Sequence, residues 1–436
     1  MSARPNILLV FTDQQRYDTI RALGSNFGAE TPNMDFLARE GIVFENCCCT
    51  GPICSPSRAT ILTGLFPSQA GMPGNLFAPC PPLSPTVPTL GNYARQAGYE
   101  TVYHGKWHLG GGDVRRYGFE IGEECSYDTQ TVQLASRFWR DRDWLEHERP
   151  FLHVVSLLNP HDHYFYDPAE RVPGFRRPWP NVGSARGDLA EPARSRAADW
   201  PEERWGAYFR FYREQIERAD RDLGELLHQF RCSGFYNNSW IIFCSDHGDM
   251  AGEHDLPFKG PFMYEGVVRV PLILVPPMTR FAGADRQGRF RHNLAPGRRT
   301  ALCSLLDLTP TLQDLMGLPK PERLSGVSLL PLVRGETDTA HEHVMAEWHG
   351  PALRMVRSAR MKYIRHRAGA DELFDLAQDP HETRNLAASP DYADAKAALS
   401  ARLDRHLAET GDPFADLDRH EFVFNPNRWA QPATIF

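Results

Sequence analysis

The strongest indication of the fold is the run Asn6-Ile-Leu-Leu-Val-Phe11, followed at once by Thr12-Asp-Gln-Gln-Arg16. The first run is aliphatic and has the length of a strand, whereas the second is polar. A short apolar run without alternation predicts a strand that is buried on both faces, as in a parallel sheet covered by helices. Because ligands bind at the carboxyl ends of the strands in such sheets, the polar residues after Phe11 stand where we expect chemistry.

The same pattern recurs along the first three quarters of the chain. It predicts further strands at residues 41–44, 101–104, 151–158, 240–244 and 270–275. The expected helices open at Thr31 with Pro32 in the first position, continue over Ala59–Leu65 and span Tyr208–Phe230. Together these elements predict an α/β fold with a mostly parallel central sheet flanked by helices.

The pattern changes from about His341. Short runs at 352–357, 361–365 and 372–376 predict antiparallel strands, and Ala393–Glu409 predicts an amphipathic helix. The chain has 436 residues, more than a single core of ordinary size uses. We therefore expect two domains, an α/β domain over residues 1–335 and a smaller C-terminal α+β subdomain with an antiparallel sheet over residues 336–436.

Composition excludes several classes of protein. With 48 Lys and Arg against 55 Asp and Glu, the net charge of −7 argues against a nucleic acid or an anionic membrane as the main partner. No apolar run approaches the roughly 18 residues of a membrane-spanning helix. The start of the chain, Met1-Ser-Ala-Arg-Pro5, lacks the apolar core of a signal peptide, so we expect a cytoplasmic protein. Nine cysteines, three of them consecutive at 47–49, favour reduced thiols.

Two strand ends carry residues that could bind a metal ion. Asp13-Gln14 follows the first strand, and Ser245-Asp-His-Gly-Asp249 follows the strand at 240–244. Alone, Asp13 would more simply cap the next helix. Together, however, the two ends offer oxygen ligands and one imidazole. Such a set suits Ca²⁺, Mg²⁺ or Mn²⁺, and the imidazole tilts the choice towards Mn²⁺.

A candidate nucleophile lies in Cys54-Ser-Pro-Ser-Arg58-Ala-Thr-Ile-Leu-Thr-Gly64. Pro56 fits the first turn of a helix, so we expect Cys54 just before a helix N-terminus, where backbone N–H groups and the helix dipole favour an anion. Arg58 follows within about one helical turn and could return its guanidinium to the same place. The alternative is a buried structural cysteine beside a surface arginine.

This segment resembles the signature of the type I sulfatases, which are members of the alkaline phosphatase-like superfamily and oxidise the cysteine to formylglycine. Further motifs occur in the order of that family along most of the chain. They are Pro5-Asn6 with Asp13, Gly105-Lys-Trp-His-Leu-Gly110, Asn159-Pro-His161, Ser245-Asp-His-Gly248, Lys259, and Tyr264-Glu-Gly266.

The resemblance implies a metal site and a modified nucleophile. Asp13, Gln14, Asp246 and His247 would hold one divalent cation, Ca²⁺ or else Mn²⁺ or Mg²⁺. Residue 54 would complete the set once a formylglycine-generating enzyme has converted Cys54.

The resemblance also implies groups that bind the substrate and move protons. Arg58 would orient the hydrated aldehyde, Lys106 and Lys259 would bind the sulfate oxygens, and His161 with Lys259 would help protonate the departing alcohol. His108 would take a proton from the second hydroxyl. Cations around the nucleophile would stabilise the negative charge that builds up in the transition state.

His163 departs from the family, which often has proline there. We interpret His163 as lining the pocket near the substrate, with a plain loop residue as the alternative. Gln14 stands where many sulfatases have a second aspartate, and His247 stands where many have asparagine. These two residues resemble the branch that contains choline sulfatases and phosphonate monoester hydrolases.

We therefore expect a sulfuric ester hydrolase that acts on a small sulfated sugar, alkyl sulfate or aryl sulfate. A phosphonate monoester or phosphodiester hydrolase is the alternative within the superfamily, although Lys106 favours sulfate. A non-catalytic protein that kept the anion pocket is the alternative from another class. The sequence does not fix the oligomeric state, and a homo-oligomer is compatible with it.

Overall fold

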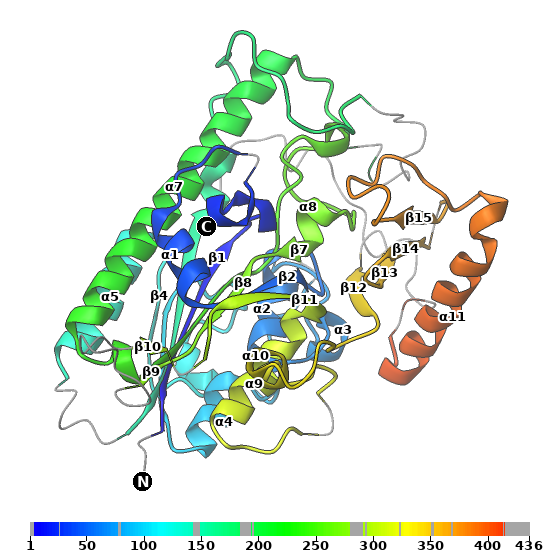
Figure 1. Ribbon diagram of the computed structural model, residues 1–436. Helices are drawn as coiled ribbons and strands as arrows, with labels where there is room; N and C mark the ends of the chain where they lie inside the picture. Colours follow the sequence, from blue (N-terminus) through cyan, green and yellow to red (C-terminus); the bar gives the residue numbers. More distant parts are fainter. Residues whose placement is uncertain are drawn as a thin grey trace.

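A mostly parallel sheet forms the centre of the computed structural model (Figure 1). The structure describes residues 4–414 except 26, 77–79, 143–148, 184–192, 194–195, 280–290, 293, 322–323, 350–352, 368 and 413. Within these residues the strand order is β11 (Gly297–Ser304), β2 (Ile42–Cys48), β8 (Leu272–Val275), β6 (Ser239–Ser245), β1 (Asn6–Asp13), β5 (Phe151–Pro160), β3 (Glu100–Gly105) and β4 (Ile121–Glu124). The predicted α/β fold is confirmed.

One predicted strand differs in direction from its neighbours. The run 270–275 forms β7 (Arg269–Val270), which pairs antiparallel with β2, and β8, which pairs antiparallel with β2 and β6. Pro271, which has no N–H to give to a sheet, separates the two pieces. An apolar run shows that a strand is buried on both faces but carries no information about its direction, so the sequence could not reveal this exception.

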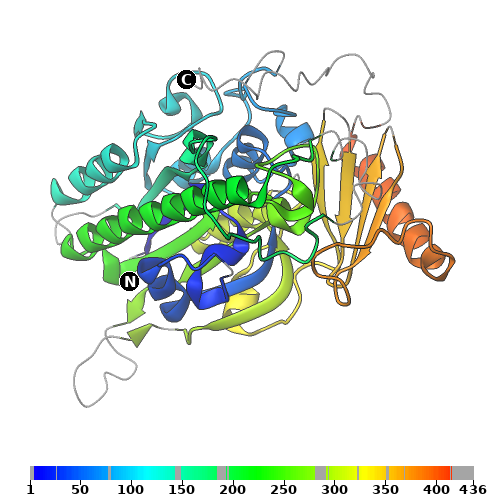
Figure 2. The same ribbon diagram turned by 90° about the horizontal axis from the view of Figure 1, so that it is seen from above.

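Helices cover both faces of the sheet (Figures 1 and 2). Along β1, Leu8 and Val10 pack in the cluster that includes residues of α1 (Pro32–Glu40), α5 (Asp128–Arg140) and α7 (Glu202–Cys232). Ile7, Leu9 and Phe11 pack in the cluster that includes α2 (Cys54–Thr63), α4 (Leu90–Gln96), α9 (Leu308–Leu315) and α10 (Leu330–Arg334). All eight residues of β1 are buried, which explains the absence of alternation in its sequence.

Besides short 3₁₀ helices, smaller elements complete the described part of the chain. They are α3 (Pro67–Ala70), α8 (Glu265–Val268) and the two-residue strands β9 (Met278–Thr279) and β10 (Arg291–His292), which pair with each other. None of the described helices is both long and apolar enough to cross a membrane.

Two helix starts differ from the prediction. Helix α2 begins at Cys54 itself, so Cys54 lies in the first turn and not just before it. Helix α7 begins at Glu202, before the predicted start at Tyr208. Helix α1 begins at Pro32 after Thr31, as predicted, although the Thr31 side chain makes no capping hydrogen bond.

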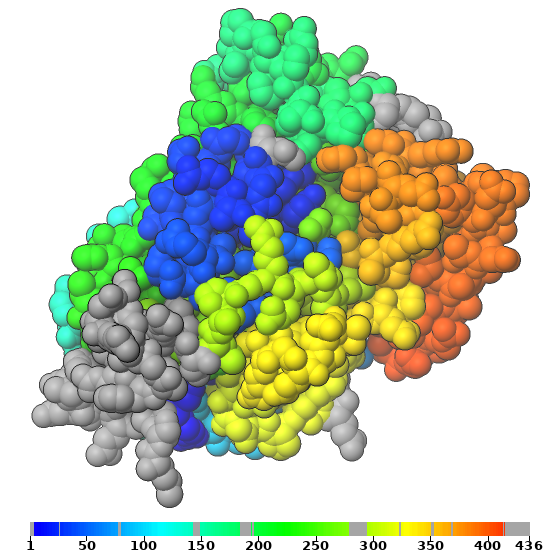
Figure 3. Space-filling model, in the orientation of Figure 1, coloured from blue at the N-terminus to red at the C-terminus, as the bar shows by residue number. Residues whose placement is uncertain are grey.

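The C-terminal part has its own antiparallel sheet, visible as a lobe in Figures 2 and 3. Its strands are β12 (Val344–Trp348), β13 (Leu353–Arg357), β14 (Met361–His366) and β15 (Glu372–Asp375), and α11 (Ala393–Thr410) packs against β13 and β14. Three of the strands and the helix were predicted, whereas β12 was not. The domain boundary at 335/336 stays a prediction, and residues 415–436 of the predicted subdomain lie outside the described residues.

Buried ion pairs join this lobe to the α/β part. The Glu265 carboxylate on α8 lies 2.9 Å from Arg357 Nε on β13 and 2.7 Å from Lys362 Nζ on β14. Lys362 Nζ also lies 2.7 Å from Glu382 Oε1, and the Glu265 N–H donates to Glu382 Oε2 at 2.7 Å. Because buried charges are tolerated only when they are paired, this cluster fixes the position of the small sheet.

Two histidines face each other inside the core. His153 on β5 is fully buried, and its Nε2 lies 3.0 Å from Nδ1 of His104 on β3. The rings of Phe138 and Trp139 surround His153. Burial lowers the pKa of His104 to about 4 and holds the pKa of His153 well below its ordinary value.

This pair predicts acid sensitivity. Below about pH 6.5 the unfolded chain takes up protons on these histidines while the folded protein does not, so stability is lost as the pH falls from about 6.5 towards 4. In His153→Gln, the free energy of unfolding should fall less steeply over that range, by up to about 1.4 kcal/mol per pH unit. Denaturant titrations at several pH values measure the slope. The exposed His228→Gln should keep the wild-type slope; equal slopes in all three proteins would contradict the prediction.

Candidate active site

Four neighbouring strands bring candidate residues to one edge of the sheet. Asp13 ends β1, Lys106 follows β3, His161 follows β5 and Asp246 follows β6. These strands are parallel to one another, so their carboxyl ends lie together at the upper edge in Figure 1. Residues from other elements complete the set, namely Cys54 and Arg58 from α2 and Lys259 from the loop between β6 and α8.

Cationic groups surround the Cys54 thiol, which is 1% exposed. Its Sγ lies 2.8 Å from Lys259 Nζ and 3.9 Å from Lys106 Nζ. His247 Nε2 lies 3.5 Å from the same sulfur. Burial and the charge of Asp13 act to raise the pKa of the thiol, but the two lysines outweigh them and hold it well below its ordinary value. The site therefore stabilises an anion at residue 54.

Arg58 connects the strand ends. Its Nη2 donates to Asp13 Oδ2 at 2.8 Å, its Nε donates to Asp246 Oδ2 at 2.9 Å, and its Nη1 donates to the Lys106 carbonyl and to Ser156 Oγ, both at 2.7 Å. The guanidinium is fully buried. Arg58 thus holds groups from β1, β3, β5 and β6 in fixed positions around the thiol.

A set of donors that could hold a metal ion lies beside the thiol. One ligand atom from each of Asp13, Cys54, Asp246 and His247 lies within 4.8 Å of all the others, and all four residues are buried. Burial raises the pKa of Asp246 to about 6, with the charge of Asp13 adding to the effect. The lysines and Arg58 overcome burial at Asp13 and hold its pKa well below the ordinary value. Two carboxylates so close together are stable only beside cations, and Arg58 already bonds both.

Gln14 adds to this fit. Its backbone N–H donates to Asp246 Oδ1 at 3.0 Å, which places the residue next to the donor set. Its side-chain Oε1 is buried and has no hydrogen-bond partner among the described residues. A buried carbonyl oxygen without a partner is unusual in a folded protein. The four predicted ligand residues therefore suit a divalent cation with oxygen and imidazole ligands.

Two glycines allow the close approach of the strand ends. A Cβ on Gly248, next to His247, would lie 2.0 Å from the Gly266 carbonyl oxygen. A Cβ on Gly105, next to Lys106, would lie 2.0 Å from the Ser156 carbonyl oxygen, and Gly105 has a φ of 105°. Larger residues would push His247 and Lys106 away from the thiol.

Both predicted proton-transfer histidines lie near the thiol. His161 begins the 3₁₀ helix η4 (His161–Phe165), and burial, with a smaller contribution from Lys106, lowers its pKa to about 3. Ser55 Oγ donates to the carbonyl of His108 at 2.7 Å and lies 3.4 Å from its Nδ1. Burial also lowers the pKa of His108. Both imidazoles are therefore neutral near pH 7.

The structure does not bring His163 to the thiol. Its Nδ1 faces the Pro160 carbonyl at 3.0 Å, its Nε2 faces Asp249 Oδ2 at 3.2 Å, and the residue is fully buried. No role was predicted from the sequence for Asp249 or Tyr164. The Asp249 side chain accepts a hydrogen bond from Gln14 Nε2 at 2.7 Å, and Tyr164 OH lies 3.3 Å from the same nitrogen. Only the position of Asp249 in the 245–249 motif could have drawn attention to it.

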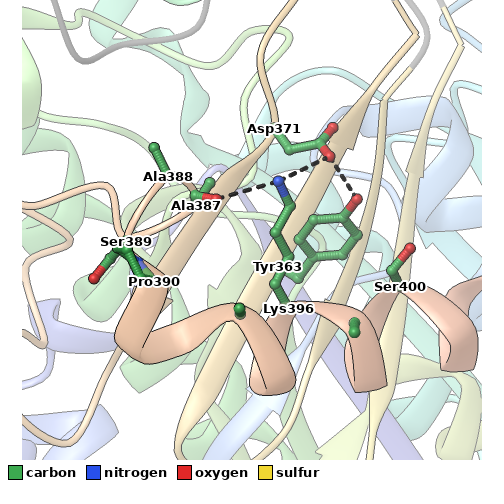
Figure 4. Close-up of a pocket in the computed structure, with 10 residues that line it drawn as sticks. Tyr363, Asp371, Ala387, Ala388, Ser389, Pro390, Lys396 and Ser400 are labelled. Carbon is green, nitrogen blue, oxygen red and sulfur yellow. Dashed lines mark hydrogen bonds and ion pairs between the residues drawn. The ribbon is translucent and has the colours of Figure 1, made fainter.

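A separate pocket lies between the small sheet and α11 (Figure 4). Tyr363 OH donates to Asp371 Oδ2 at 2.7 Å, and Lys396 Nζ lies 3.8 Å from the same oxygen. None of the candidate catalytic residues lines this pocket. The polar side chains of this pocket contact one another, so we regard the pocket as a surface feature of the lobe.

Comparisons with known proteins agree with the geometry. The sulfatase family profile matches residues 5–318, and the profile of the N-sulphoglucosamine sulphohydrolase C-terminal region matches residues 252–409. A choline-sulfatase of Rhizobium meliloti is 30% identical over 93% of this chain and 87% of its own. An ulvan-active sulfatase of Formosa agariphila is 28% identical over 98% of this chain and 87% of its own.

A solved structure shows the same fold. A 2-O GAG (glycosaminoglycan) sulfatase superimposes with a TM-score of 0.77 and 27% identity, covering 95% of this chain and 94% of the other. The matched profile spans most of the chain, and the proteins named here are all sulfatases. The chain therefore belongs to the sulfatase family, with its alkaline phosphatase-like fold, and is a sulfuric ester hydrolase.

Proposed function

We propose that this chain cleaves a sulfate monoester with a nucleophile derived from Cys54 by oxidation to formylglycine, beside a bound divalent cation. The observation that carries the proposal is the contact of 2.8 Å between Cys54 Sγ and Lys259 Nζ, with Lys106 and His247 also beside the sulfur. A sulfate monoester is an anion, and cations fixed around the nucleophile stabilise the charge that develops as the ester bond breaks.

Four residues would hold the cation, namely Asp13, Gln14, Asp246 and His247, together with residue 54. When bound, the cation would act as a Lewis acid at this position. Formylglycine, in its hydrated form, supplies a hydroxyl nucleophile in place of the thiol. Arg58 would keep the two aspartates oriented, because it bonds both at once.

The lysines and histidines would bind the substrate and move protons. Burial alone would lower the pKa of Lys259, but the acidic groups around it raise the pKa well above its ordinary value, so Lys259 keeps its proton. Lys259 and Lys106 would bind the sulfate oxygens. His161, which is neutral near pH 7, would donate a hydrogen bond to the departing oxygen alongside Lys259. His108, also neutral, would accept the proton of the hydroxyl that remains on residue 54.

For the alcohol part of the substrate we propose a sulfated sugar. The 2-O GAG sulfatase, similar over nearly the whole chain, supports this class. Choline sulfate is the second candidate, because the choline-sulfatase is 30% identical. Turnover of a panel of sulfated monosaccharides against choline sulfate distinguishes the two.

Loss of Cys54 should abolish turnover. Protein co-expressed with a formylglycine-generating enzyme should give a residue-54 peptide about 18 Da lighter than the thiol form. Cys54→Ala should lower kcat by at least about 10³-fold, because the nucleophile is gone. Cys49→Ala, at a buried cysteine whose Sγ donates to the Val267 carbonyl, is the matched control and should retain activity. Near-wild-type activity of Cys54→Ala would contradict the mechanism.

Removal of divalent cations should inactivate the enzyme. After dialysis against EDTA, we expect both the activity and the melting temperature to fall, because a cation that binds only the folded state stabilises it. Addition of Ca²⁺, Mn²⁺ or Mg²⁺ should restore both, and the ion that restores them best identifies the preferred metal. EDTA presaturated with Ca²⁺ is the control. Full activity in metal-free protein would contradict the proposed cation.

Sulfate esters should be preferred to phosphonate esters. With 4-nitrophenol as the common leaving group, we expect kcat/KM for the sulfate monoester to exceed that for a phosphonate monoester by at least about 10-fold. Initial rates at 400 nm measure both. A reversed preference would replace the proposal with a phosphonate monoester hydrolase, which uses the same apparatus.

A further inference from the structure

The side chain of Gln14 is held in one orientation. The residue has a φ of 67° and is fully buried. Its carbonyl accepts a hydrogen bond from Tyr212 OH at 2.7 Å, and its N–H donates to Asp246 Oδ1 at 3.0 Å. The backbone is therefore fixed on both sides, and the question that remains for the buried side chain is which end of its amide faces which neighbour.

Asp249 decides that orientation. A carboxylate can only accept hydrogen bonds, and Asp249 Oδ2 accepts one from Gln14 Nε2 at 2.7 Å. If the amide were reversed, two oxygens would face each other across that distance. The NH₂ end must therefore point to Asp249, and Oε1 is left as the buried oxygen without a partner among the described residues. This oxygen is the atom that a cation ligand requires.

Asp249 is itself fixed by donors on every side. Tyr208 OH and the Ala251 N–H both donate to Oδ1 at 2.7 Å, and His163 Nε2 lies 3.2 Å from Oδ2. His163 is held in turn by the Pro160 carbonyl, 3.0 Å from its Nδ1. With the Gln14 amide, these groups leave both oxygens of Asp249 as hydrogen-bond acceptors.

We propose that Asp249 is the positioning residue that turns the oxygen of Gln14 towards the cation, and that His163 acts through Asp249. The inference rests on the proposed function, since it assumes that a divalent cation binds beside Cys54. It gives His163 a role that acts through Asp249, whereas the sequence suggested a pocket-lining role. A glutamine can serve as a dependable ligand only when something fixes the orientation of its amide, and the buried carboxylate does so here.

The test is the affinity for Ca²⁺ and Mn²⁺, measured by competition with a chelating dye and independent of turnover. All proteins should carry residue 54 in the same state, verified by mass. In Asp249→Asn, an NH₂ group in place of Oδ2 faces two of the four groups, Gln14 Nε2 and His163 Nε2, and reversal of the Gln14 amide relieves the conflict with Gln14. We expect the affinity to fall about 10- to 100-fold, as for other groups that orient metal ligands.

A paired exchange provides the rescue. In Gln14→Glu/Asp249→Asn the amide and the carboxylate change places, so the bond between the two residues is kept and an oxygen still faces the cation. The affinity should return to within about threefold of wild type. This double variant also serves if Asp249→Asn alone does not fold, and an affinity as low as that of Gln14→Ala would then overturn the proposal.

Glu253→Gln is the matched control. Glu253 is another buried carboxylate in the loop after β6, and it pairs with Arg16 at 3.2 Å and His381 at 3.5 Å. Its loss should lower the melting temperature in EDTA but leave the metal affinity unchanged. If wild-type protein binds neither ion, the cation of the proposed function fails. If wild type binds but Asp249→Asn binds equally well, only the positioning role fails.

Discussion

The guanidinium of Arg58 bonds residues of β1 and β5 and the residues directly after β3 and β6 at the same time. It is fully buried, so its charge must be matched, and Asp13 and Asp246 match it. These aspartates are also the acidic members of the metal donor set. The ion pairs of the Arg58 guanidinium with the two carboxylates therefore hold the strand ends together. They also position helix α2 and set the distances between the catalytic groups. Without them, two buried carboxylates and a low-pKa thiol would repel one another.

Around this centre, most of the strands and helices could be predicted from the sequence. Apolar runs such as 6–11 and 151–158 became strands because burial on both faces leaves no room for polar residues. The motifs at 13–14, 54–58, 106–108 and 245–247 converge because parallel strands end at one edge. The antiparallel direction of β8 and the early start of α2 were missed, since neither depends on hydrophobicity.

The side-chain details lay beyond the sequence for a different reason. Whether His163 lines a pocket or supports a neighbour depends on which acceptor its ring nitrogens meet, and Asp249 comes from a strand end far away in the chain. Tyr164 and Asp249 can be recognised as part of the site only from their hydrogen bonds to Gln14, which the structure reveals. A sequence motif identifies the residues that carry out the chemistry but not the residues that orient them.

The buried ion cluster of Glu265, Arg357, Lys362 and Glu382 also bears on how this protein can be re-engineered. A chimera that exchanges only β12 to α11 would leave Glu265 buried without its cationic partners, at a cost that a small sheet cannot offset. The transferable unit must include helix α8. The C-terminal profile, which matches residues 252–409, also takes in α8. The electrostatic unit thus extends beyond the lobe seen in Figure 2, because it takes in a helix of the α/β part.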